Sequence, residues 1–291
     1  MQKSFLGKLS KPIISIYSEI ECKGFCKCVY SSYRNALIIS GYDEGCLKLY
    51  NSEDKLIDTI KNDKIKKPWS LYLDKFENLY LCDLFKKPIV NILVFDSTMK
   101  FVYEFELKKW RNLTVDSIVI DEQNEINFLY VSSRLDNKIG MWNSINGEFL
   151  KFIDIDSPHF MCFSEDKLFV SSSFDSKVDK LRKVGKSNSN CIFVLNKYTH
   201  DIVRKICNPN WQNPIGLLIN NGNIMTIARC HNEDNNVLQS RCYLVLDMNG
   251  GIKEKIKLEG VNITVNSISD LLFYENKIVY LTEKSIKFIE L

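Results

Sequence analysis

The chain has 291 residues, of which 45% are hydrophobic, so it is long and apolar enough to bury a sizeable core. Its 39 Lys and Arg nearly balance its 36 Asp and Glu, which gives a formal net charge of +3 at pH 7. This balance is too weak to indicate a nucleic-acid-binding protein from total charge alone, so such a function would depend on where the charges lie.

Targeting and membrane signals are missing from the sequence. The first residues, MQKSFLGKLSKP, lack the apolar segment of a signal peptide. No run of about 18 apolar residues occurs, so we expect no membrane-spanning segment and no membrane partner. We therefore expect a cytoplasmic protein in which the ten cysteines stay reduced.

Cysteine and histidine spacing gives no metal-binding pattern. Cys26 and Cys28 alternate along FCKCVY, as residues on one face of a strand do, and no paired Cys-x-x-Cys sites occur. The three histidines, His159, His200 and His231, are scattered. We expect buried or idle thiols, no metal ion and no cofactor.

In chain order, the first expected element is a strand within residues 11–21, KPIISIYSEIE. Three similar units follow, each made of short alternating apolar segments separated by polar turns. They cover residues 25–60, 67–107 and 114–155. Each unit runs from an apolar entry strand through an acidic or Asn-rich turn to strands such as NLYL and NILVF. The same supersecondary unit is therefore repeated.

Later copies of the repeated unit differ more in sequence but keep the same pattern of strands and turns. Residues 159–206 and 214–258 each contain a polar insertion, and the last copy, residues 267–291, stops after three strands. Equivalent apolar residues recur every 39 to 56 positions, at Leu37, Leu79, Leu129, Leu168, Ile224 and Ile278. Four strands per unit at this period predict an all-β, six-bladed β-propeller with antiparallel blades. The strand within residues 11–21 would complete the last blade, so that residues 1–291 form one domain.

The second unit resembles a known repeat. Its segments PWSLYLD (68–74), ENLYLCD (77–83) and ILVF (92–95) are similar to the proline, apolar–Asp, Gly-Asn-Ile-Tyr-Val-x-Asp and Ile-x-Val-Phe segments of NHL repeats. The third unit echoes it in IVID (118–121) and the fifth in NPIGL (213–217). Ser70 stands where the repeat usually has glycine, and the His-Arg pair before the third strand has no match. The resemblance implies an NHL-like propeller, as in the C-terminal domain of tripartite-motif NHL proteins.

Strand direction alternates within a four-stranded blade, so the interblade loops and the second-to-third-strand loops should share one face. These loops contain more Lys and Arg than Asp and Glu, and the excess lies along one arc that includes LKKWRN (107–112). We call this set the basic arc. Its members are Lys64, Lys66, Lys67, Phe85, Lys86, Lys87, Lys108, Lys109, Trp110, Arg111, Arg134 and Lys138.

The basic arc predicts a binding platform rather than an enzyme. Its cations could contact several phosphates of single-stranded RNA while Phe85 and Trp110 stack on bases. Tripartite-motif NHL proteins use a positively charged propeller face for single-stranded or hairpin RNA, so the resemblance implies the same partner. None of that family's RING, B-box or coiled-coil segments is present here.

Two alternatives stay open. The same face could recognise a partner protein, with Tyr42, Phe85, Trp110 and Trp211 as anchors, and Trp110 and Trp211 could instead wedge between blades. Some similar propellers are metal-dependent lactonases or lyases, whose ligands converge on the central channel. Asp270 and Asn266 could face that channel, but the other blades supply no matching set and no phosphate loop or nucleophile elbow occurs.

Overall fold

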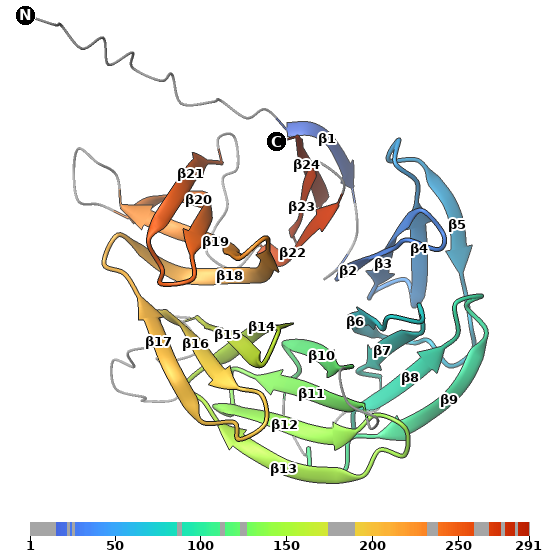
Figure 1. Ribbon diagram of the computed structural model, residues 1–291. Helices are drawn as coiled ribbons and strands as arrows, with labels where there is room; N and C mark the ends of the chain where they lie inside the picture. The colour runs from blue at the N-terminus through green and yellow to red at the C-terminus, as the bar shows by residue number, and fades with distance from the viewer. Residues whose placement is uncertain are drawn as a thin grey trace, which may run out of the picture.

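The computed structural model describes residues 16–21, 24, 27–85, 89–110, 114–122, 127–173, 190–231, 238–258, 268–274, 277–282 and 285–290. All regular elements within these ranges are β-strands, labelled β1 to β24 in chain order. They form six four-stranded sheets. Figure 1 shows the sheets arranged around a common centre, which confirms the prediction of an all-β propeller with four-stranded antiparallel blades.

Five sheets are built from four consecutive strands each. The first contains β2 (Cys28–Ser31), β3 (Ala36–Gly41), β4 (Cys46–Tyr50) and β5 (Leu56–Ile60). The second contains β6 (Pro68–Leu73), β7 (Leu79–Asp83), β8 (Asn91–Phe95) and β9 (Phe101–Glu106). The third contains β10 (Ser117–Asp121), β11 (Phe128–Ser133), β12 (Lys138–Asn143) and β13 (Phe149–Asp154).

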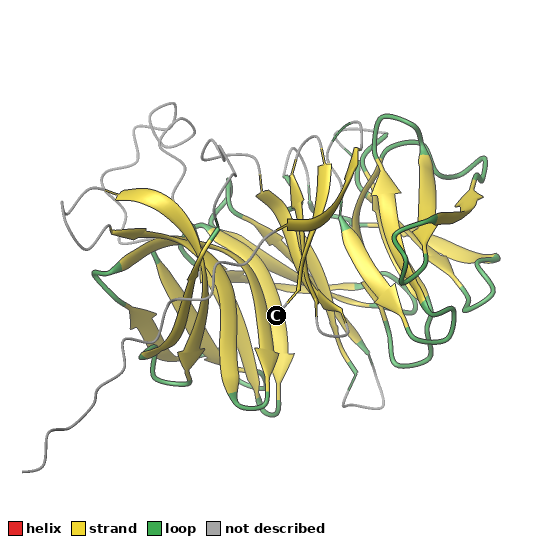
Figure 2. Cartoon of the chain, turned by 90° about the horizontal axis from the view of Figure 1, so that it is seen from above, coloured by secondary structure: helices red, strands yellow, loops and turns green. Residues whose placement is uncertain are grey.

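The fourth sheet contains β14 (Pro158–Ser164), β15 (Lys167–Ser172), β16 (Cys191–Asn196) and β17 (Ile202–Cys207). The fifth contains β18 (Trp211–Asn220), β19 (Asn223–His231), β20 (Leu238–Asp247) and β21 (Ile252–Lys257). The first strands of neighbouring sheets contact one another in the closed order β2, β6, β10, β14, β18, β22 and back to β2. These strands surround the centre, and Figure 2 shows the sheets running between two faces that carry the loops.

The two ends of the chain complete the sixth sheet, in the order β1 (Ile16–Glu21), β24 (Ser285–Glu290), β23 (Lys277–Thr282), β22 (Ile268–Tyr274). β1 runs antiparallel to β24, with Ile20 opposite Ile286. The expectation that a strand within residues 11–21 completes the last blade is therefore confirmed. Because the outermost strand of the last sheet comes from the opposite end of the chain, the ring is closed by backbone hydrogen bonds.

Short polar residues end or directly follow the third strand of five sheets and fix the turn that comes next. Asp96 Oδ1 accepts hydrogen bonds from the backbone N–H groups of Thr98 and Lys100, at 2.8 and 3.0 Å. Asn and Asp favour such turns because their side chains can replace a backbone acceptor. The equivalent residues in the other four sheets also accept backbone N–H groups of their turns, and they are Asn51, Asn143, Asn196 and Asp247.

Hydroxyl groups on the second strand of three sheets tie the inner strands together. Ser132 Oγ donates to the carbonyl of His159 in the next sheet at 2.6 Å. Ser40 Oγ lies 3.2 Å from the carbonyl of Trp69, also in the next sheet. Ser171 stays within its own sheet and accepts the N–H of Phe160 at 3.0 Å. These buried serines therefore form hydrogen bonds with backbone groups of the inner strands that are not paired within the strand ladders.

The apolar core lies between neighbouring sheets. One cluster joins residues of β7 and β8 to residues of β10, β11 and β12, with Trp110 and Trp142 in its middle. A second cluster joins the fourth and fifth sheets around Trp211. Burial of both faces of each sheet explains the apolar runs in the inner strands.

One expectation about the cysteines is wrong. Cys191 and Cys207 are joined by a disulfide, although the sequence led us to expect that all ten thiols stay reduced. The reason is the strand register, which places the two residues directly opposite each other in β16 and β17, with Cα atoms 4.5 Å apart. Outside this disulfide, the cysteines Cys28, Cys46, Cys82, Cys230 and Cys242 are buried.

Candidate functional site

The interblade loops and the second-to-third-strand loops contact one another, so they share one face as expected. Asp83, at the end of β7, accepts the backbone N–H groups of Lys66 and Lys67 at 2.8 and 2.9 Å. Asp116, just before β10, accepts the N–H of Arg134 at 2.7 Å. We call this side of the propeller the interblade-loop face.

Several cations of the basic arc are held by side chains of the protein itself. Lys64 pairs with Glu104 at 3.2 Å and lies over the ring of Phe101. Lys67 pairs with Asp43 at 3.6 Å and lies over Tyr42. These contacts offset part of the positive charge that the sequence places on this face.

Two other lysines of the basic arc lie over aromatic rings. Lys109 Nζ is 5.0 Å from the ring centre of Phe149, and Lys138 Nζ is 5.1 Å from that of Phe152. Both distances fall within the range of cation–π attraction. Lys66 and Lys108 are exposed.

Trp110 does not reach the surface. Its side chain is 1% exposed and packs edge-on against Trp142, with ring centres 5.3 Å apart. The second ring beside it is Phe152, at 5.9 Å. The prediction that Trp110 stacks on an RNA base is therefore wrong, and the alternative of a wedge between blades is correct. The physical reason is that apolar residues of two neighbouring sheets surround the indole.

Phe85 is the aromatic residue of the basic arc that faces solvent. It is 58% exposed just after β7 of the second sheet, and Ile89 beyond it is also exposed. Of the other expected anchors, Trp211 is fully buried and Tyr42 packs edge-on against Trp69 at 5.5 Å. Lys86, Lys87 and Arg111 lie outside the described residues.

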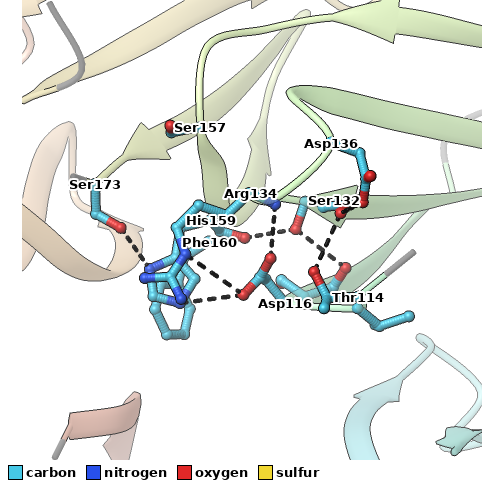
Figure 3. A network of polar contacts seen from close by, with 12 residues as sticks. Thr114, Asp116, Ser132, Arg134, Asp136, Ser157, His159, Phe160 and Ser173 are labelled. Atoms are coloured by element: carbon cyan, nitrogen blue, oxygen red, sulfur yellow. Dashed lines mark hydrogen bonds and ion pairs between the residues drawn. The ribbon is translucent and has the colours of Figure 1, made fainter. Parts of the chain in front are cut away.

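A polar cluster lies on the same face, beside the inner strands β10, β11 and β14, and Figure 3 shows it from close by. His159, at the start of β14, is its middle member. Its Nε2 atom lies 3.9 Å from Asp116 Oδ1, and its Nδ1 atom is hydrogen-bonded to Ser173 Oγ at 2.8 Å. Arg134 Nε lies 4.0 Å from the same Asp116 oxygen. The third and fourth sheets thus bring three ionisable side chains around one point.

Lys27 and Arg241 add positive charge from the first and fifth sheets. Lys27 precedes β2, is 7% exposed and places its Nζ 4.1 Å from the ring centre of Phe160, the residue after His159. Arg241, in β20, is also buried, and its Nη1 lies 3.5 Å from the carbonyl of Asn213. We call Lys27, Asp116, Arg134, His159 and Arg241 the central cluster.

Burial and charge shift the protonation of this cluster. The pKa of His159 lies well below its usual value, because burial and then the charges of Arg134, Lys27 and Arg241 disfavour the imidazolium. The pKa of Asp116 is raised by burial, which outweighs the attraction of Arg134 and Lys27. The imidazole is therefore neutral at pH 7 and sits in a positive potential.

This cluster was not predicted from the sequence. The histidines are scattered along the chain, and the loop pattern places Arg134 on the basic arc rather than beside His159 and Asp116. Neither Lys27 nor Asp116 belongs to a recognisable motif. The usable signal was positional, because Lys27, Asp116 and His159 all lie within one or two residues of the start of an inner strand.

The described residues contain no metal-binding group. No set of three His, Cys, Asp or Glu side chains in that part of the chain is close enough to hold an ion. Asn266 lies outside the described residues, as does the side chain of Asp270. Within the same ranges, no helix is long and apolar enough to cross a membrane.

Comparison with known proteins supports the fold alone. No family model and no curated protein matches the chain. Kuenenia stuttgartiensis hydrazine synthase is 13% identical, with a match that covers 96% of this chain and 77% of that chain and a TM-score of 0.62. The WD40 β-propeller domain of Doa1 is 16% identical, with 92% of this chain and 79% of that chain covered and a TM-score of 0.61. Streptogramin B lyase is 9% identical, with 94% of this chain and 97% of that chain covered and a TM-score of 0.59. At such low identity they indicate a shared propeller architecture and carry no function. The resemblance to NHL repeats stays a prediction.

Proposed function

We propose that this protein is a non-enzymatic platform that binds a partner protein through its interblade-loop face. The observation that carries the proposal is that several members of the basic arc are buried or paired within the protein. Trp110 is buried, and Lys64 and Lys67 are paired with acids of the same protein. Among the described members of the basic arc, Phe85, Lys66 and Lys108 are exposed and take part in none of these contacts.

A mixed-charge surface with an exposed aromatic residue fits a protein partner better than a phosphate backbone. Protein interfaces combine aromatic anchors with a polar rim, whereas binding of single-stranded RNA depends on unpaired cations and several stacking rings. Phe85 and Ile89 supply the apolar anchor here, and the exposed Lys66 and Lys108 supply polar groups on the same face. The solved propeller of Doa1 shares the architecture on which such a surface is displayed. RNA binding through this face stays a prediction.

The geometry of His159 favours binding over catalysis. Ser173, His159 and Asp116 follow one another in the order of groups in a serine hydrolase. Asp116 lies 3.9 Å from the imidazole, however, beyond hydrogen-bond reach, and Ser173 is buried at 1% exposure. A nucleophile needs access to its substrate, so we infer no acyl transfer at this place.

The proposal is tested by cross-linking the intact protein in its native extract, identifying the partner, and measuring its affinity with both proteins purified. Phe85→Ser removes the exposed ring without touching the core and should weaken the complex by roughly tenfold or more. Phe76→Ser is the matched control, because Phe76 is similarly exposed but follows β6 on the opposite face. Equal affinity of the Phe85→Ser variant and the unchanged protein would contradict the proposal.

A further inference from the structure

The central cluster combines three cations and the carboxyl group of Asp116 with a neutral histidine. Lys27, Arg134 and Arg241 come from three different sheets, and each acts on His159 through its charge. Lys27 and Arg241 are buried, so their charges are little screened by solvent. The cluster thus concentrates positive potential at the inner edge of the interblade-loop face.

The cluster can be reached from outside at one edge. The side chain of Arg134 is 24% exposed, while those of His159 and Asp116 are 12% and 11% exposed. Arg134 Nε is buried without a hydrogen bond within the described part of the chain, and it lies 4.0 Å from Asp116 Oδ1. A ligand oxygen would therefore be met by the terminal N–H groups of the guanidinium.

We propose that the central cluster binds the oxygen atoms of a carboxylate or phosphate group, held by Arg134 and His159 with Lys27 and Arg241 supplying the surrounding positive charge. His159 can donate from Nε2, because Ser173 can donate its hydroxyl proton to Nδ1. Asp116 would then orient Arg134, whose backbone N–H it already accepts. This site does not depend on the proposed protein partner.

The source of the oxyanion can be a free small molecule or the acidic side chain of another protein. Thermal unfolding of the full chain should therefore be followed with three probes at constant ionic strength set by NaCl. They are inorganic phosphate, malonate, and the blocked peptide acetyl-Gly-Glu-Gly-amide. A ligand that binds only the folded state raises the melting temperature as its concentration exceeds its Kd, so at least one probe should raise it.

Site variants separate this binding from a general salt effect. Arg134→Gln should weaken binding of the stabilising probe by roughly tenfold, as expected when a charge-assisted hydrogen bond is removed. Lys66→Gln removes the same charge from an exposed position on the same face and should leave the affinity unchanged. Arg134→Lys keeps the charge without the planar fork and should bind with intermediate affinity, which gives a reading if Arg134→Gln fails to fold.

The outcomes are distinct. A larger effect of malonate or phosphate supports the site with a small molecule as its ligand, and a larger effect of the peptide supports it with an acidic side chain. Absence of any shift beyond the NaCl control, or equal affinity in the Arg134 and Lys66 variants, would overturn the proposal. Weaker partner binding in Phe85→Ser with retained anion binding would show that the two sites act separately, as proposed.

Discussion

At the scale of single residues, environment decides the role of a side chain more than its type does. Trp110 stands between Lys109 and Arg111 in a basic turn, which suggests a surface contact when only the sequence is read. In the structure Lys109 adopts a positive φ of 69°, and the indole packs into the core beside Trp142. The burial of Trp110 depends on side chains of the third sheet, so its neighbours in the sequence could not reveal it.

Replacing Trp110 therefore tests a structural role. Trp110→Ala should lower the free energy of unfolding by about 3–5 kcal/mol, because it leaves a cavity between two sheets. Trp110→Phe should cost less, since it keeps an aromatic ring and removes an indole N–H that has no hydrogen-bond partner among the described residues. Chemical denaturation of both variants measures the difference. A Trp110→Ala protein as stable as the unchanged chain would refute the assigned packing.

Acidification should destabilise the fold through its buried histidine. The folded-state pKa of His159 is lowered, so the unfolded state binds a proton first as the pH falls below about 6.5. Stability should then decrease by at most about 1.4 kcal/mol per pH unit from this residue. The groups that face it are Asp116, Arg134, Lys27, Arg241 and Ser173.

His159→Asn provides the comparison. The variant should lose stability less steeply than the unchanged protein between about pH 6.5 and 5.5. His200, whose pKa is also lowered by burial, contributes to the pH dependence of stability in both proteins. Denaturant titrations at several pH values give the two slopes. Equal slopes would show that His159 titrates alike in the folded and unfolded protein.

At the scale of strands and turns, the sequence was most informative where local chemistry repeats. Alternating apolar residues and the Asn or Asp at or just after the end of the third strand in five sheets specify short strands and turns without help from distant segments. The pairing of β1 with β24 could also be predicted, because a three-stranded last unit leaves an open edge. The Cys191–Cys207 pair could not, since it depends on the register of β16 and β17.

Gly140 lies so close to the rings of Trp142 and Trp110 that there is no room for a side chain. A Cβ atom at this position would clash with Trp142 and lie 2.7 Å from Trp110 Cζ3. Gly140→Ala should therefore destabilise the protein by about 1–3 kcal/mol through overpacking between the second and third sheets. Thermal or denaturant unfolding checks this. Gly222→Ala is a control for the added methyl group, since a Cβ there meets no atom within 4 Å, although its φ of 68° adds strain of its own.

Removal of β1 tests closure of the ring. A protein lacking residues 1–21 should expose one edge of β24, because Ile286 and its neighbours then keep β23 on one side and have no strand on the other. We expect a lower melting temperature and association through the open edge. Calorimetry and light scattering measure these. A truncated protein that stays monomeric with unchanged thermal stability would exclude a closing role for β1.

At the scale of the whole molecule, architecture follows from the repeat more directly than function does. The repeat period predicted the propeller, and the alternation of strand direction predicted which loops meet on one face. The distribution of charge on that face could not be read as function, because the sequence does not show that Lys64 pairs with Glu104 or Lys67 with Asp43. The central cluster was likewise hidden, since its members come from four sheets. Which side chains of different sheets meet depends on how the sheets are arranged in the closed ring.

The claim that the interblade-loop face recognises protein rather than RNA can be tested by polarisation titrations with a pool of short single-stranded RNAs over a salt series. We expect only weak binding at physiological salt, with affinity unaffected by the double variant Lys66→Ala/Lys108→Ala. Tight binding that weakens steeply with salt would contradict the claim, if the double variant also lowered the salt slope by about 0.7 for each phosphate that it no longer neutralises.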